Sequence, residues 1–259
     1  MKEVMKSKPA REFFDYEPES LNGKNILITG GTTGIGRSTA ILLAAQGANV
    51  LIFGRHEKEL DDAMRDIQEA GGSVIGLTAD VSNPEDIQRV FKELDQQFGT
   101  LDILINNAAL GYNSVMKGGY EDWAYIVNTN LVGYMAMAHE AIERMKVNKQ
   151  GHIVNVGSMS AEVYEENSSV YVATKSGIKG FSISLRKEVN EMGIKVSLVE
   201  PGLVGTDMQK ESPEEQSRME EKMEMLKAED IAACIYFMLT QPKRCDVIAV
   251  EVRPHLQLI

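Results

Sequence analysis

Short apolar runs alternate with longer stretches of helical periodicity along most of this chain. The first run, Asn25 to Thr29, is typical of a buried parallel strand, and a glycine-rich turn and a helical pattern follow it directly. Similar runs predict strands at Asn49 to Phe53, Ser73 to Thr78, Asp102 to Ile105, His152 to Val156, Lys195 to Val199 and Val247 to Val252. Alternating strands and helices predict an α/β fold: a doubly wound, mostly parallel sheet, seven-stranded, with helices on both faces.

The helical patterns fill the intervals between these runs. They predict helices at Arg37 to Gln46, Glu57 to Ala70, Pro84 to Phe98, Trp123 to Met145, Ser169 to Glu191 and Ile231 to Leu239. No linker or internal repeat divides the 259 residues, of which 43% are apolar. We therefore expect a single domain over residues 21–259, preceded by a polar arm, residues 1–20, of unknown role.

Charge excludes some classes of partner. A net charge of −11 disfavours binding to nucleic acid or to anionic membranes, which both require a basic face. Glu211 to Asp230 carries much of the acidic excess, and a solvated surface helix is favoured there over recognition of a cationic substrate. The first twenty residues lack an apolar core of the kind found in secretory signals, and Ile231 to Leu239 is too short to cross a bilayer. We expect a soluble, cytoplasmic protein.

The cysteines and histidines add no site of their own. Cys234 and Cys245 do not form a disulfide framework, so reduced thiols are expected. The four histidines have no metal-ligand spacing, among themselves or with the cysteines, so no metal site is predicted.

The turn after the first strand is rich in glycine, with Gly30, Gly34 and Gly36 in seven residues. Glycine permits a tight turn and a close approach of backbone to a diphosphate, and the following helix offers its N-terminal amides to the anion. The spacing is neither G-x-G-x-x-G nor a P-loop, and a turn without a ligand stays an alternative.

Tyr171 and Lys175 are four residues apart, which places both on one face of a helix. An ammonium about 4 Å from a phenol favours the phenolate by roughly 4 kcal/mol, or about three pKa units, before desolvation opposes it. The pair therefore predicts acid/base chemistry, and Ser158 adds a hydroxyl for the substrate oxygen. Such a spacing also arises by chance in helices where the tyrosine is only packing.

Taken together, these motifs resemble the short-chain dehydrogenase/reductases of the compact, single-domain branch, from Leu21 to the C-terminus. The resemblance implies a Rossmann-type fold and a catalytic tetrad of Asn130, Ser158, Tyr171 and Lys175. It also implies that these residues contact the cofactor: Gly30, Thr32, Thr33, Gly34, Ile35, Gly36, Arg55, Asp80, Val81, Asn107, Ala108, Tyr171, Lys175, Pro201, Gly202, Val204 and Thr206. Ala109 stands where the family more often has glycine.

The end of the second strand bears on the choice of cofactor. Gly54 stands where a carboxylate would bind the ribose 2′-hydroxyl of NAD(H), and Arg55 follows it. Because a guanidinium pairs well with phosphate, we predict NADP(H) rather than NAD(H). The alternative is that Arg55 is only a surface charge and has no part in cofactor preference.

The resemblance implies an oxidoreductase that interconverts a carbonyl and an alcohol by hydride transfer, with Tyr171 as general acid/base. Lys175 would bind the nicotinamide ribose, and Asn130 would hold a water in a proton relay. A non-catalytic NADP(H)-binding sensor or scaffold, and an isomerase or dehydratase, stay as alternatives. The resemblance also implies a homodimer or homotetramer through the two longest helices.

The substrate is less defined by the sequence. The pocket is predicted to be lined by residues that follow the site motifs, under a mobile lid at about 205–226. These residues are Leu110, Tyr112, Met159, Ser160, Val163, Tyr164, Leu203 and Val204. The segment from Leu239 to Pro254 weakly resembles the end of NADP-dependent 3-hydroxy acid dehydrogenases. We expect a small carbonyl or alcohol compound.

Overall fold

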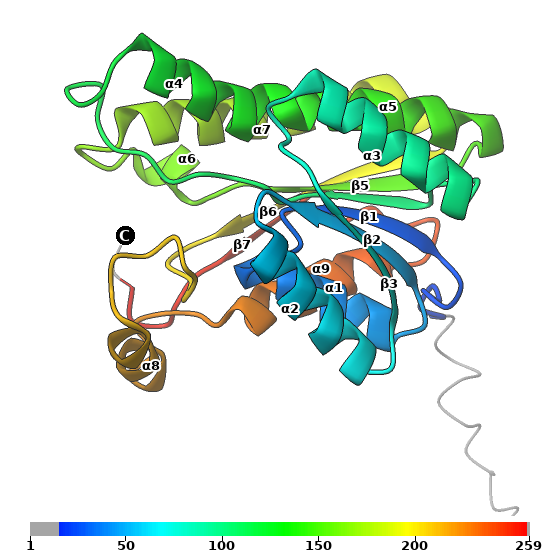
Figure 1. Cartoon of the computed structure of the whole chain (residues 1–259), viewed down its shortest axis with the longest axis horizontal. Coiled ribbons are helices and arrows are strands. Elements are labelled where there is room, and N and C mark those ends of the chain that lie inside the picture. Colours follow the sequence, from blue (N-terminus) through cyan, green and yellow to red (C-terminus); the bar gives the residue numbers. More distant parts are fainter. Residues whose placement is uncertain (1–15, 258–259) are drawn as a thin grey trace, which may run out of the picture.

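A seven-stranded parallel sheet forms the centre of the molecule (Figure 1). This computed structural model describes residues 16–257. The strand order is β3-β2-β1-β4-β5-β6-β7, and every pair is parallel. The strands are β1 (Asn25–Thr29), β2 (Asn49–Gly54), β3 (Ser73–Thr78), β4 (Ile103–Asn106), β5 (Gly151–Val156), β6 (Ile194–Pro201) and β7 (Ala249–Val252). The predicted fold class is confirmed, with the sheet wholly rather than mostly parallel.

Helices cover both faces of this sheet, in two layers (Figure 1). On one face lie α1 (Gly34–Ala45), α2 (Glu57–Glu69) and α9 (Ala228–Leu239). On the other lie α3 (Pro84–Gln97), α5 (Gly133–Asn148) and α7 (Ser169–Val189). Shorter helices are α4 (Tyr120–Val127), α6 (Ser160–Val163) and α8 (Pro213–Glu221).

Side-chain alternation along the strands divides the core between the two layers. Ile26 and Ile28 of β1 belong to the cluster under α1 and α9, whereas Leu27 belongs to the cluster under α3 and α5. All three are fully buried. A strand covered on both faces reads as a continuous apolar run, which is why the pattern predicted these strands well.

The helix predicted over Trp123 to Met145 is interrupted in the structure. A π-helical turn, Asn128–Val132, separates α4 from α5. The side chain of Asn130 lies in this turn, accepts from the backbone N–H of Leu110 at 2.8 Å and donates to its carbonyl oxygen at 2.8 Å. Apolar periodicity does not reveal such a turn, because it depends on a partner twenty residues away.

Several element ends also differ from the prediction by one to three residues, among them those of β6, β7 and α7. β6 continues to Pro201, because Pro201 still pairs with Val252 of β7. β7 begins at Ala249 rather than Val247. α7 ends at Val189, and a 3₁₀ turn then leads to Gly193, whose φ of +76° favours glycine.

The described part of the predicted arm lies against the end of α9. The backbone N–H of Glu19 donates to the carbonyl of Thr240 at 2.9 Å, and the Tyr16 hydroxyl donates to Gln241 at 3.3 Å. Residues 1–15 of the arm lie outside the described residues.

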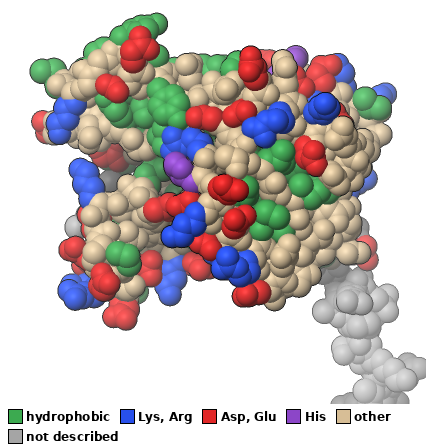
Figure 2. All heavy atoms as spheres, viewed as in Figure 1, with side chains coloured by type: hydrophobic (Ala, Val, Ile, Leu, Met, Phe, Trp, Pro, Cys, Tyr) green, Lys and Arg blue, Asp and Glu red, His purple; other side chains and the backbone are tan. Residues whose placement is uncertain are grey.

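Acidic and basic side chains are interspersed on the face shown in Figure 2, and the basic ones form no continuous patch there. In residues 16–257, no helix is both long and apolar enough to cross a membrane.

Candidate functional site

A cleft of about 820 Å³ opens at the carboxyl ends of the strands. Its walls come from the segments that follow β1 to β6, on both sides of the point between β1 and β4 where the strand order reverses. Open α/β sheets bind their ligands at this position. Nearly all of the predicted site residues line the cleft: Gly30, Thr32, Thr33, Gly34, Ile35, Arg55, Asp80, Val81, Asn107, Ala108, Ser158, Tyr171, Lys175, Pro201, Gly202, Val204 and Thr206.

One end of the cleft, which we call the glycine end, is formed by residues at or after the ends of β1, β2 and β3: Gly30, Thr32, Thr33, Gly34, Ile35, Gly54, Arg55, His56, Glu59, Ala79, Asp80 and Val81. Gly30 and Gly34 have φ values of +61° and +51°. A β-carbon on Gly30 would lie 2.9 Å from Cα of Ala108, and one on Gly36 would lie 2.1 Å from the carbonyl oxygen of Gly30. The turn therefore requires glycine, and Gly36 serves the packing of α1 rather than the cleft wall.

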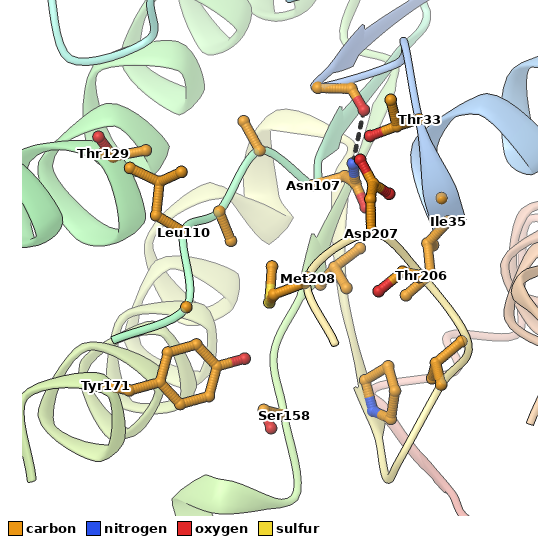
Figure 3. Close-up of a pocket in the computed structure, with 18 of the residues that line it drawn as sticks. Thr33, Ile35, Asn107, Leu110, Thr129, Ser158, Tyr171, Thr206, Asp207 and Met208 are labelled. Atoms are coloured by element: carbon orange, nitrogen blue, oxygen red, sulfur yellow. Dashed lines mark hydrogen bonds between the residues drawn. The ribbon is translucent and has the colours of Figure 1, made fainter. Parts of the chain in front are cut away.

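The N-terminus of α1 is left free for an anion. No side chain caps it, its first turn contains no acidic residue, and Thr33 stands at the N-cap. Unpaired N–H groups at such a position favour a phosphate. Asn107 fixes the turn from behind, since its amide donates to the carbonyl oxygen of Thr29 at 3.1 Å and to that of Gly30 at 3.0 Å, and Figure 3 draws one of these bonds. The geometry fits the diphosphate of a dinucleotide.

Arg55 is exposed at the outer part of the glycine end. Its Nη1 donates to the Tyr125 hydroxyl at 2.6 Å, and that hydroxyl donates to Oδ2 of Asp80 at 2.8 Å. Burial raises the pKa of Asp80, but hydrogen bonds from Ser82 and Tyr125 outweigh it and the net pKa is lowered. Neither Tyr125 nor Glu59 was in the predicted site. Of the two, Glu59 lines this end of the cleft.

The other end, which we call the tyrosine end, is formed by residues that follow β4, β5 and β6 together with Tyr171: Leu110, Gly111, Tyr112, Asn113, Ser158, Met159, Ser160, Glu165, Ser168, Tyr171, Leu203, Val204, Thr206, Asp207, Met208, Gln209 and Lys210. The Tyr171 ring points from α7 into the cavity toward Ser158 (Figure 3). Lys175 is buried one turn further along α7, with Nζ 5.6 Å from the centroid of the Tyr171 ring. Its ammonium donates to the carbonyl oxygen of Val156 at 3.1 Å, which also accepts from the Tyr134 hydroxyl at 3.1 Å.

The electrostatics of Tyr171 differ from the sequence-based expectation. Burial raises its pKa, the hydrogen bond with Ser158 opposes this, and the charge of Glu165 adds to the rise. Burial also lowers the pKa of Lys175 to about 8. The expected lowering by Lys175 is not among the causes of this shift; burial dominates, and the phenol stays protonated at neutral pH.

Asn130 is fully buried, and the structure does not bring its side chain to the cleft wall. Its amide holds the backbone of Leu110, which does line the cleft. Val163 and Tyr164 were predicted to line the pocket but lie outside it, whereas Leu110, Tyr112, Met159, Ser160, Leu203 and Val204 line it as predicted.

Glu165, Asp207 and Met208 line the tyrosine end but were not among the residues named for the pocket from the sequence. The Ser158 hydroxyl donates to that of Ser160 at 3.1 Å, and Ser160 donates to Oε1 of Glu165 at 3.0 Å. Asp207 and Met208 line the cleft beside Thr206 (Figure 3). Both lie within the segment that was predicted as a lid, at about 205–226, but neither was named as a lining residue.

Behind this end lies a cluster of three carboxylates. Oxygens of Glu162, Glu200 and Glu251 lie within 4.8 Å of one another. Lys179 donates to Oε2 of Glu200 at 3.1 Å and also bonds Glu162. Because an ammonium already lies among these groups, we describe the cluster as an ion-pair network.

Comparison with known proteins identifies the class. A family model described as short chain dehydrogenase matches residues 24–217. The chain belongs to the short-chain dehydrogenase/reductase family and is an oxidoreductase of that family.

Individual relatives agree with this placement. An uncharacterized oxidoreductase of Staphylococcus aureus (strain USA300) is 31% identical over 236 residues, which cover 90% of this chain and 98% of the relative. The 3-oxoacyl-[acyl-carrier-protein] reductase FabG of Vibrio cholerae is 36% identical over 198 residues, 76% of this chain and 80% of the relative. The crystal structure of a metagenomic short-chain oxidoreductase in complex with NADP has a TM-score of 0.80 at 26% identity, covering 92% of this chain and 100% of that one.

Proposed function

We propose that this protein is an NADP(H)-dependent oxidoreductase that interconverts a small carbonyl compound and the corresponding alcohol. The observation that carries the proposal is that the phenol of Tyr171 points toward Ser158 in the same cleft as the glycine turn. A dinucleotide whose diphosphate binds at the glycine end would extend toward Tyr171. When bound, its nicotinamide supplies or accepts the hydride.

Tyr171 would exchange the proton. Its raised pKa keeps the hydroxyl protonated near neutral pH, so it can donate to the oxygen of a carbonyl during reduction. Ser158 would donate a second hydrogen bond to that oxygen and hold it in line with the phenol. In the oxidative direction Tyr171 would accept the alcohol proton, which is less favourable at the same pH because the phenolate must form first.

Lys175 and Asn130 support this arrangement in different ways. The Lys175 ammonium lines the cleft and is fixed by the carbonyl of Val156, a position suited to a ribose hydroxyl. Asn130 acts from behind by holding Leu110, so we assign it a positioning role in place of direct contact with the substrate.

Preference for NADP(H) is supported by Arg55, whose guanidinium lies at the end of β2 where a 2′-phosphate would be placed. The metagenomic relative was crystallised with NADP, which agrees with this preference.

The substrate is proposed only as a class. FabG of Vibrio cholerae is named a 3-oxoacyl-[acyl-carrier-protein] reductase, so 3-oxo compounds belong among the first candidates for this chain. Exposed apolar side chains on α7 and on the π-turn and α5 support the proposed homodimer or homotetramer; they are Ile183, Val132 and Met135. Location in the cytoplasm stays a prediction.

An NADPH-depletion assay over aldehydes, ketones and 3-oxo acids, run beside NADH, tests the proposal. We expect at least one carbonyl compound to be reduced, with a higher kcat/KM for NADPH than for NADH. Tight binding of NADPH without turnover on any compound would favour the sensor or scaffold. Faster turnover with NADH would overturn the cofactor assignment alone.

A further inference from the structure

Tyr125 stands outside every predicted motif and outside the cleft wall, yet it bonds two residues of that wall. It projects from α4, which belongs to the layer of helices opposite α1 and α2 (Figure 1). We propose that Tyr125 is a positioning residue for cofactor selectivity: its hydroxyl holds Arg55 where the 2′-phosphate of NADP(H) binds. This inference rests on the proposed function.

The chemistry of the three groups fixes the direction of both hydrogen bonds. A guanidinium only donates and a carboxylate only accepts, so the Tyr125 hydroxyl must accept from Arg55 and donate to Asp80. Each bond is charge-assisted, and the distances of 2.6 and 2.8 Å are short. Cζ of Arg55 lies 6.0 Å from the centroid of the Tyr125 ring, so the guanidinium stands beside the hydroxyl edge of the ring.

Asp80 is the fixed end of this chain. Its Oδ1 accepts from both the backbone N–H and the hydroxyl of Ser82, each at 2.8 Å, and its own N–H donates to Asp86 at 2.8 Å. Because the Tyr125 hydroxyl is bonded to Asp80, it restrains the Arg55 side chain in one position. That side chain is exposed and would otherwise sample many rotamers.

The hydroxyl is also a spacer between opposite charges. With Tyr125 in place, one N–H of Arg55 is used, and the remaining N–H groups stay available to a phosphate. Without the hydroxyl, the guanidinium is free to pair directly with Asp80 or with nearby Glu59, and its charge is then lost to the 2′-phosphate. A ligand that lacks the 2′-phosphate gains little from Arg55 and is insensitive to this change.

The test is isothermal titration calorimetry with two probes that differ at the 2′ position, adenosine 2′,5′-bisphosphate and AMP. Tyr125→Phe keeps the ring and removes only the hydroxyl. We expect it to weaken binding of the bisphosphate about five- to tenfold, because Arg55 is no longer held at the 2′-phosphate, and binding of AMP less than about twofold. Tyr120→Phe, on the same helix and 76% exposed, is the matched control and should change neither.

Arg55→Ala separates this inference from the proposed function. If Arg55→Ala weakens bisphosphate binding and Tyr125→Phe does not, Tyr125 has no positioning role and the inference is overturned. If Tyr125→Phe lost the same affinity for the bisphosphate and for AMP, the inference would also be overturned, because an equal loss indicates a structural effect. If wild type binds the two probes equally and Arg55→Ala changes nothing, the NADP(H) assignment fails and the role of Tyr125 fails with it.

Discussion

At the glycine end of the cleft the backbone supplies much of the wall, whereas at the tyrosine end exposed side chains supply much of it. Gly30, Gly34 and Gly36 tolerate no β-carbon in their places, and Asn107 bonds the turn from behind. At the tyrosine end, Glu165, Met208 and Lys210 are exposed and come from segments between elements. The difference indicates that the proposed cofactor site is set by the sheet, while the proposed substrate site is free to vary without changing the fold.

The glycine end should therefore be the more fragile of the two. Gly36→Ala would place a methyl 2.1 Å from the carbonyl oxygen of Gly30 and 2.5 Å from the Asn107 amide. Because both neighbours are held by the turn, we expect the free energy of unfolding to fall by more than about 3 kcal/mol. Urea denaturation measures it.

Gly119 near the tyrosine end is the matched control. Apart from its chain neighbours, no atom lies within 4 Å of the place a β-carbon would take, and its backbone is extended, with φ of −146°. Gly119→Ala should cost less than about 1 kcal/mol. Equal losses from the two substitutions would contradict the contrast between the ends.

The ion-pair network behind the tyrosine end gives the next largest effect. Lys179→Met leaves Glu200, whose side chain is 1% exposed, without its cation and should destabilise the protein by about 2–3 kcal/mol at neutral pH. Burial already raises the pKa of Glu200, and removal of Lys179 raises it further.

The sign of the pH dependence follows from this. A carboxyl whose pKa is raised on folding favours the folded state while it is protonated, and this contribution is lost as pH rises through its folded pKa. The deficit of Lys179→Met relative to wild type should shrink as pH falls from about 8 to about 5. A deficit independent of pH would show that packing, rather than charge, is lost.

Lys175 lies in the cleft between the two ends, and its burial should lower the free energy of unfolding at neutral pH. Its pKa is lowered by burial from 10.5 to about 8, so the folded state disfavours the ammonium. The contribution of this group to the free energy of unfolding should rise as pH increases from about 8 to about 10.5. Lys175→Met should lack that rise and be more stable than wild type by about 2 kcal/mol at neutral pH, measured by urea denaturation. A less stable variant would contradict this interpretation.

The smallest effect is expected from the tyrosine end itself. Met208 is 45% exposed and lines the cleft, so Met208→Ala should raise KM for a carbonyl substrate about two- to fivefold through lost apolar contact. The Kd for NADPH should not change. Met116→Ala, at 87% exposure and outside the cleft, is the control. A large change in the Kd for NADPH would show that the two ends are not separable.

The same contrast explains what the sequence could predict. β1 and β3 were placed to the residue, and Gly30 was predicted to lie in the turn, because burial and special backbone conformations leave periodic or compositional signals. Tyr171, which the structure places in the cleft, was predicted from its spacing to Lys175. The sequence contains no such signal for Tyr125 or for the π-turn at Asn130, since each depends on a hydrogen-bond partner far along the chain. The rise in the pKa of Tyr171 was also missed, because the balance between burial and a nearby charge depends on distances in the folded protein.

The central claim is that Tyr171 exchanges a proton during hydride transfer. It is tested most directly by comparing single-turnover oxidation of NADPH by wild type and Tyr171→Phe, with a carbonyl compound that wild type reduces. The account predicts a rate about 10³-fold lower in Tyr171→Phe, with the Kd for NADPH unchanged within about twofold. A near-normal rate in Tyr171→Phe would contradict it.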